Sequence, residues 1–112
     1  MNTEALKGHL DLLLLAIVQS RPAHGYAIIE ELKRRSEGTF DLQEGTVYPA
    51  LHRLERAGLL TSHWSEEKGR RRRVYELTQQ GRSALGNYQN EWRRFATGIN
   101  TVLQEVAGSW QA

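Results

Sequence analysis

The chain has 112 residues, of which 39% are hydrophobic and 25% charged, so it suits one compact domain with a modest core and has no room for a second. Its formal net charge is only +2, so any surface that binds a polyanion must come from local clustering of charge. The absence of cysteine excludes disulfides and thiolate metal sites, and it agrees with a reducing compartment.

The N-terminal segment carries no signal for export or for membrane insertion. No basic region precedes the apolar run from Leu10 to Val18, which is too short to span a bilayer and contains Asp11. We therefore expect a cytoplasmic protein without a membrane span.

Two helices are expected in the first third of the chain. The first is a largely buried helix of about four turns that ends at Ser20-Arg21-Pro22. Its apolar residues recur with the 3.6-residue period, at Leu6, Leu10, Leu13, Leu14, Ile17 and Val18. A second, amphipathic helix starts near His24-Gly25 and runs to about Ser36. His24 and Tyr26 are expected to fix its start, and Tyr26 could also reach a phosphate group.

The third expected helix, from near Gly45 to Ala57, has one apolar face and one open face. Val47, Leu51 and Leu54 recur at i, i+4 and i+7, so this face must dock on the rest of the domain. Pro49 is tolerated only in the first turn of a helix, which locates the helix start just before it. The open face, above all its first two turns, is then free to meet something outside the domain.

After the helices the hydrophobic period changes to two, which predicts a two-stranded hairpin. Leu60–Trp64 and Arg71–Thr78 are strand-like, and the polar stretch Ser65–Arg70 between them is expected to form the turn. Five of the six residues in Lys68–Arg73 are basic, so the hairpin presents positive charge beside the third helix. Three helices and such a hairpin make a winged helix-turn-helix, a mainly α fold with a small β-hairpin.

The last segment predicts one long helix that Thr78 caps at its start. Its apolar residues are spaced 3, 4, 3, 4, 3, 4, which is a heptad seam: Leu85, Tyr88, Trp92, Phe95, Ile99, Val102 and Val106. A domain of this size has little core left for so long a seam to cover, so we expect it to pair with a second copy. Within one compact domain, we therefore distinguish a winged region, residues 1–78, from a dimerisation helix, residues 79–112.

Taken together, these motifs resemble the PadR family of transcriptional regulators over nearly the whole chain. The matching pieces are His24-Gly25-Tyr26, Gly45-Thr46-Val47-Tyr48-Pro49-Ala50-Leu51 with Arg53-Leu54-Glu55, Gly58-Leu59-Leu60, Tyr75-Glu76-Leu77-Thr78, and Gly81. The single C-terminal helix resembles the compact branch of that family, whose members are dimeric winged-helix repressors. In some relatives a tryptophan at the position of Trp92 lines a pore at the dimer interface and stacks on flat hydrophobic ligands. The resemblance thus implies a homodimer on an inverted repeat of double-stranded DNA, with a flat aromatic effector beside Trp92 and Phe95.

The expected DNA contacts fall into two groups. The third helix is expected to supply base and phosphate contacts through Gln43, Thr46, Tyr48, His52 and Arg53. The wing is expected to reach the flanking backbone or the minor groove through Lys68, Arg70 and Arg71, while Arg72 and Arg73 extend along the strand. Three alternatives remain open: Thr46 could cap its helix, the arginine run could be a solvated turn, and Trp92 and Phe95 could simply fill a coiled-coil seam.

No constellation of an enzyme or a metal site is visible. The histidines, His9, His24, His52 and His63, lack i, i+4 ligand spacing, and the chain has no glycine-rich phosphate loop and no serine–carboxylate arrangement. We expect no enzyme, no cofactor and no metal. The favoured function is a dimeric, sequence-specific DNA-binding repressor that a small molecule controls. The alternative is a protein-interaction module that uses the winged fold without DNA, and the basic hairpin argues against it.

Overall fold

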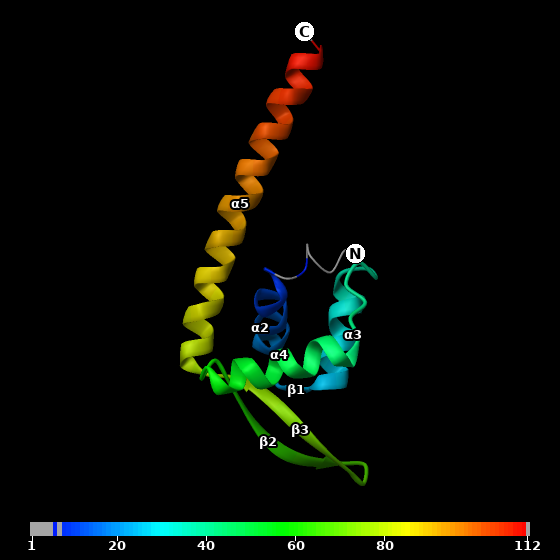
Figure 1. The fold of residues 1–112 in the computed structure, drawn as a ribbon. Helices are drawn as coiled ribbons and strands as arrows, with labels where there is room; N and C mark the ends of the chain where they lie inside the picture. Colours follow the sequence, from blue (N-terminus) through cyan, green and yellow to red (C-terminus); the bar gives the residue numbers. More distant parts are fainter. Residues whose placement is uncertain (1–5, 7, 112) are drawn as a thin grey trace.

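The helices and strands follow the order that the sequence predicts, with one additional short strand. The computed structural model describes residues 6 and 8–111, with side chains up to residue 104. In chain order it contains α2 (Leu10–Ser20), β1 (Ala23–His24), α3 (Gly25–Arg35), α4 (Glu44–Arg56), β2 (Leu60–Glu67), β3 (Arg70–Leu77) and α5 (Gln79–Gln111). Figure 1 shows α2, α3 and α4 gathered over a small sheet, with α5 leaving this body as a long projecting helix. The fold is the predicted winged helix-turn-helix with a long C-terminal helix.

The three helices of the body bury a common core. α3 and α4 lie within one residue of their predicted bounds, but α2 has 11 residues and begins at Leu10, about one turn later than expected. Gly8 precedes this start, and glycine is a poor helix former. Leu6 is nevertheless buried. The main core cluster consists of Leu14, Leu15, Ile17, Val18, Ile28, Ile29, Leu32, Val47, Ala50, Leu51, Leu54, Leu60, Tyr75, Leu77 and Leu85.

The wing is longer and its turn tighter than the sequence suggested. β2 and β3 pair in antiparallel register from Leu60↔Leu77 to Glu67↔Arg70, and β1 adds a third strand on the other side of β3. The turn consists only of Lys68 and Gly69, whose φ angles of 52° and 74° suit a two-residue hairpin turn of type I′. The prediction that Ser65–Arg70 forms a loop was wrong, because Glu66 and Glu67 stand opposite arginines and such opposite-charge pairs stabilise a ladder.

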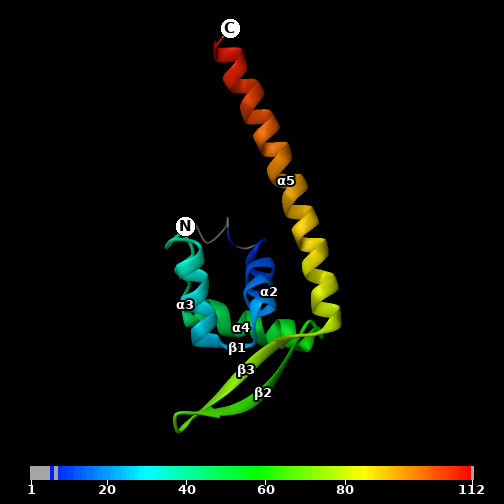
Figure 2. The ribbon, with the colours of Figure 1, turned by 180° about the vertical axis from the view of Figure 1, so that it is seen from behind.

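The start of α5 is fixed to the end of α4. The Thr78 hydroxyl accepts a hydrogen bond from the Gly81 backbone N–H (2.9 Å) and donates one to the Gly58 carbonyl (2.7 Å). The predicted cap is thereby confirmed. From both sides, α5 starts where the hairpin joins the body and points away from the hairpin tip (Figures 1 and 2). Although α5 has 33 residues, neither it nor any other described helix has the apolar stretch that a membrane crossing requires.

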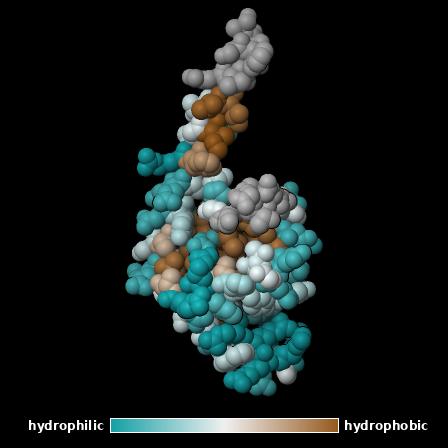
Figure 3. Space-filling view, viewed as in Figure 1, coloured by the Kyte–Doolittle hydropathy of each residue, from teal (hydrophilic) through white to brown (hydrophobic). Residues whose placement is uncertain are grey.

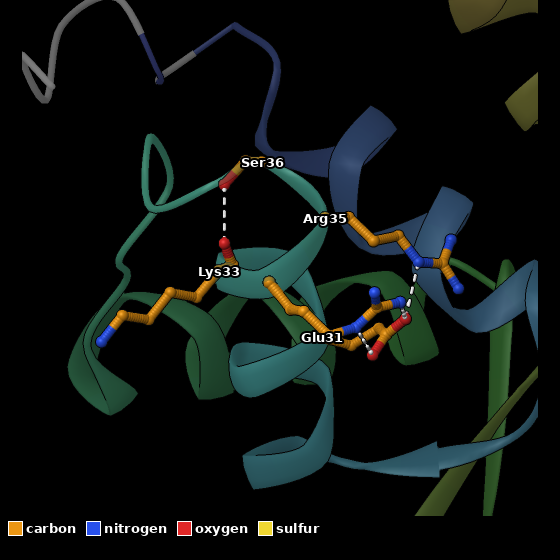
Figure 4. Close-up of polar contacts among 5 residues, drawn as sticks. Glu31, Lys33, Arg35 and Ser36 are labelled. Atoms are coloured by element: carbon orange, nitrogen blue, oxygen red, sulfur yellow. Dashed lines mark hydrogen bonds and ion pairs between the residues drawn. The ribbon is translucent and has the colours of Figure 1, made fainter.

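The far end of α3 carries a cluster of exposed charges, shown in Figure 4. Glu31 binds Arg34 (2.6 Å) and Arg35 (2.7 Å), and these two arginines, Arg34 above all, lower the pKa of its carboxyl to about 2. The Ser36 hydroxyl donates to the Lys33 carbonyl (3.3 Å), as the helix ends. Ion pairs in such exposed positions contribute little stability, so this end is a solvated face.

Candidate nucleic-acid interface

A groove with a volume of about 640 Å³ separates the wing from the first turns of α3 and α4. Its walls are almost entirely aromatic and basic: His24, Gly25, Tyr26, Glu44, Tyr48, Trp64 and Arg70–Arg73. Four of these residues are arginines, and Glu44 is the one carboxylate among the described residues of the lining. The fold therefore brings Tyr26, Tyr48, Arg70 and Arg71 together, as expected of one binding surface.

The ring of Tyr48 lines the groove and packs closely against α3. A Cβ atom built on Gly25 would lie 2.5 Å from the Tyr48 ring, so only glycine permits this contact. Tyr48 is consequently half-buried, although the sequence placed it off the apolar stripe of its helix. The glycine of the His24-Gly25-Tyr26 motif thus sets how closely α3 approaches α4, and it fixes the Tyr48 ring in the groove.

Two of the arginines are tied to the body of the protein. The Arg73 Nε donates to the Ser62 hydroxyl (2.7 Å), which itself donates to Glu55 of α4 (2.6 Å). The Arg72 guanidinium lies 2.7 Å from the His24 Nε2. Arg70 and Lys68, in contrast, are exposed and form no ion pair with any side chain in residues 6 and 8–104. The two groups that the sequence distinguished, arginines along the strand and cations toward the tip, are therefore separated in the structure.

His24 fixes the start of α3, as predicted. Its Nδ1 accepts a hydrogen bond from the Ala27 backbone N–H (3.2 Å). Burial, and then the charge of Arg72, lower the pKa of His24, which favours the neutral ring. Because a neutral imidazole has a single ring lone pair, Ala27 and Arg72 compete for it. His24 therefore couples the helix start to the wing.

The open face of α4 carries Gln43, Thr46 and His52, all exposed. The helix begins at Glu44 with Gln43 in the N-cap position, so Thr46 lies one turn inside and is not the cap. One alternative reading of Thr46 is thereby removed. Its contact with DNA, like those of Gln43 and His52, stays a prediction.

Arg53 points away from the groove, toward α2. Its two terminal nitrogens bind both carboxylate oxygens of Asp11, at 3.0 and 2.6 Å. This forked ion pair was not anticipated, and it raises the pKa of Arg53. The predicted DNA contact of Arg53 stays a prediction, with Asp11 as a competitor for the guanidinium.

A second cluster lies between α5 and the segment before α2. His9 meets Trp92 edge to face, with ring centroids 5.2 Å apart, and the Phe95 ring is 6.0 Å from Trp92. These three aromatic side chains line two open hollows of about 230 and 370 Å³, the larger completed by Leu6, Leu12, Leu13 and Phe40. Trp92 and Phe95 thus already have partners within their own chain, while remaining 43% and 55% exposed.

The predicted dimer seam is divided by the structure. Leu85 is buried in the core of its own chain, and Tyr88 packs partly against that core. Ile99 and Val102 are exposed, together with Leu103. Figure 3 shows a hydrophobic patch on the projecting part of α5. The side chain of Val106 lies outside the described residues. The surface available to a second copy therefore begins after Tyr88.

The sequence did not indicate a role for three side chains at or near the candidate interface: Trp64 and Ser62 of the wing, and Asp11 of α2. For the wing, a usable signal existed: a two-residue turn at Lys68-Gly69 fixes the register and places Trp64 opposite Arg73. For Asp11 no local signal exists, because its partner is 42 residues away along the chain. Among residues 6 and 8–104, no three His, Asp or Glu side chains are grouped so that they could hold a metal ion.

Comparison with known proteins agrees with this geometry. Residues 14–87 match the transcriptional regulator PadR-like family. The chain is 47% identical over 85 residues to transcriptional regulator Rv3488 of Mycobacterium tuberculosis, covering 76% of this chain and 70% of that protein. Its structure is similar to that of a PadR family transcription regulator from Clostridium difficile R20291, with 35% identity, a TM-score of 0.75, and coverage of 86% and 99%. A transcriptional regulator from Clostridium thermocellum superposes with a TM-score of 0.82 at 25% identity, covering 88% and 97%. The chain therefore belongs to the PadR-like family of transcriptional regulators, which implies that it binds DNA and is not an enzyme.

Proposed function

We propose that the protein is a cytoplasmic, dimeric, sequence-specific repressor whose DNA affinity changes when a flat aromatic molecule binds beside Trp92. The observation that carries the DNA-binding part is the groove between α4 and the wing, which has four arginines and one carboxylate in its described lining. A polyanion is the ligand that such a surface attracts. Residues 1–78 act as the reading head and residues 79–112 as the dimerisation helix.

The arrangement on DNA follows from pairing through α5. Two copies place their α4 helices about 34 Å apart, in successive major grooves of an inverted repeat. The open face of α4 reads bases, through Gln43, Thr46 and His52. One backbone strand lies in the groove, where Tyr26, Tyr48, Arg70 and Arg71 contact its phosphates, and Lys68 in the hairpin turn reaches the same strand beyond the groove.

Because the wing contacts phosphates and α4 contacts bases, substitutions in the two elements should reduce DNA affinity in different ways. Replacing Arg70 and Arg71 together by alanine should weaken binding to all DNA sequences, because phosphate contacts carry no sequence information. It should also flatten the slope of log affinity against log salt concentration by about one to two units. An operator can be selected from random DNA by its binding to the wild-type protein. Thr46→Ala should instead weaken binding to this selected operator by about 1–3 kcal/mol, and binding to random DNA less. Fluorescence anisotropy over a salt series measures both effects.

The matched control for charge is the double change Arg93→Ala and Arg94→Ala, which removes two cations from α5, away from the groove. It should leave the salt slope nearly unchanged. An equal slope for both double variants would mean that the wing makes no phosphate contact. If the wild type gives no salt-dependent mobility shift, the protein does not act through DNA.

Asp11 offers a separate test of Arg53. Asp11→Asn should raise DNA affinity about 1.4- to 5-fold, because it frees the Arg53 guanidinium from an ion pair worth about 0.2–1 kcal/mol. Asp41→Asn is the control, since it breaks the exposed pair between Asp41 and Lys33 (3.7 Å) instead. Weaker binding by Asp11→Asn would show that the pair positions α4 and that Arg53 does not contact DNA.

The effector site is tested by ligand binding. Flat cationic aromatic dyes should bind in the hollows lined by Trp92 and Phe95, where Glu91 supplies a carboxylate, and should quench Trp92 fluorescence. Trp92→Ala should lower their affinity at least about tenfold, because both the stacking and the buried area are lost. The same variant must retain DNA binding. If a panel of such dyes binds wild type and Trp92→Ala with equal affinity, the hollows beside Trp92 are not an effector site.

A further inference from the structure

We infer that Trp64 is a DNA-contacting residue of the wing, whose indole packs against the backbone strand in the groove and holds Arg71 in place for a neighbouring phosphate. This inference rests on the proposed DNA binding and adds a residue that the arginine run alone does not indicate.

Trp64 lies in β2 just beyond the part of the sheet that packs on the hydrophobic core. Side chains alternate between the two faces of a strand, so Leu60, Ser62 and Trp64 share one face with their partners Leu77, Tyr75 and Arg73. The pairs nearer the body are covered, since Leu60, Tyr75 and Leu77 are buried. The side chain of Trp64, in contrast, is not buried by the body: it lines the groove, and 53% of its surface is exposed. A large apolar side chain therefore faces the space that the backbone strand is proposed to occupy.

Two guanidinium groups lie close to the indole ring. Arg71 lies 4.8 Å and Arg73 5.3 Å from its ring centroid. Arg73 is immobilised by Ser62 and by Glu55, whose carboxylate is 3.6 Å away, so the indole rests against a fixed group. Arg71 is exposed, and among residues 6 and 8–104 it forms no ion pair, so its contact with the indole is what holds it.

The contact with the indole leaves the N–H groups of Arg71 available for a phosphate. A guanidinium that stacks on an aromatic ring uses its flat face, and its N–H groups at the edge remain available for phosphate oxygens. An arginine held in this way loses less conformational freedom on binding than a free one. The indole itself offers an apolar surface to a deoxyribose or a base, a contact that tolerates any sequence. Trp64 therefore contributes to affinity for all DNA rather than to operator choice.

The test compares Trp64→Ala, Trp64→Phe and the wild type on the selected operator and on random duplex DNA. Trp64→Ala should weaken binding to both DNAs by about tenfold, a loss typical of one aromatic stacking contact. Trp64→Phe should keep most of the affinity, because a phenyl ring still supports Arg71. Combined with Arg71→Ala, the Trp64→Ala change should cost less than it does alone, because the two residues act together. Circular dichroism confirms that each variant is folded.

A fluorescence measurement separates a direct contact from a loss of stability. In a protein carrying Trp92→Phe and Trp110→Phe, Trp64 is the only tryptophan, and its emission should be quenched by saturating DNA. If this protein binds DNA while its emission is unchanged, and folded Trp64→Ala binds as the wild type does, the inference is wrong while the proposed function stands. If the wild type binds no DNA, the proposed function fails first and the inference with it.

Discussion

Replacing Gly81 by alanine is expected to lower the free energy of unfolding by about 3 kcal/mol, the upper part of the range for overpacked sites. A Cβ atom there would collide with the Leu59 carbonyl oxygen and lie 2.7 Å from the Leu77 Cδ1. That carbonyl cannot retreat easily, because it accepts a hydrogen bond from the Thr78 backbone N–H (3.2 Å). The close approach of α5 to the end of α4 must then open. Thermal unfolding at fixed protein concentration should show a Tm lower by about 10–15 °C.

Gly86→Ala is the matched control on the same helix. No atom outside its own turn of helix lies within 4 Å of the Cβ that it would add. Alanine should therefore stabilise the helix there by about 0.5–1 kcal/mol, the usual advantage over glycine. If Gly81→Ala melted at the wild-type temperature, the contact between α5 and the α4 end would have to be looser than described.

Charging the exposed seam of α5 should convert the proposed dimer to monomers. Phe95→Glu together with Ile99→Glu places two carboxylates where two apolar surfaces meet, and an unpaired buried charge costs several kcal/mol. Association should weaken by about 1,000-fold or more, which corresponds to about 4 kcal/mol. Sedimentation velocity at micromolar concentration should then show one slow species in place of a dimer.

The control puts the same charges on the opposite side of the helix. Thr97→Glu with Thr101→Glu alters two exposed residues off the seam and should leave the dimer intact. A wild type that sediments as a monomer would contradict the proposal directly. In that event α5 would have to cover its apolar side chains by some other means.

Most of the fold could be predicted because its signals are local in the sequence. Hydrophobic period located α3 and α4 within one residue, but Pro49 lies five residues after the start of α4, beyond the first turn in which it was expected. The two-residue strand β1 could not be foreseen, since it forms only by pairing Ala23 and His24 with β3. The burial of Leu85 in the core of its own chain could not be foreseen either. A heptad pattern indicates an apolar face, but whether that face meets the chain's own core or a second chain depends on the tertiary fold.

The candidate site was only half predictable for a related reason. The arginine run predicted a basic surface. Which arginines remain free for a ligand depends on the pairing register of β2 and β3: Arg73 is held by Ser62 and Glu55, whereas Arg70 is exposed. The Arg53–Asp11 pair depends on how α2 crosses α4, which no local pattern encodes. Residue types therefore predicted the kind of ligand, and packing decides which atoms can reach it.

The projecting half of α5 also bears on how the protein folds. Beyond Phe95 the helix lies clear of the body in both views, and Ile99, Val102 and Leu103 are exposed (Figures 1 and 2). An isolated helical segment of this length is only marginally stable in water, so in the proposed dimer its helical order would come from contact with the second copy. Acquisition of structure in this segment and subunit association would then be one equilibrium. The unfolding midpoint should rise with protein concentration by mass action, and at high dilution the amide protons of this segment should exchange before those of the winged body.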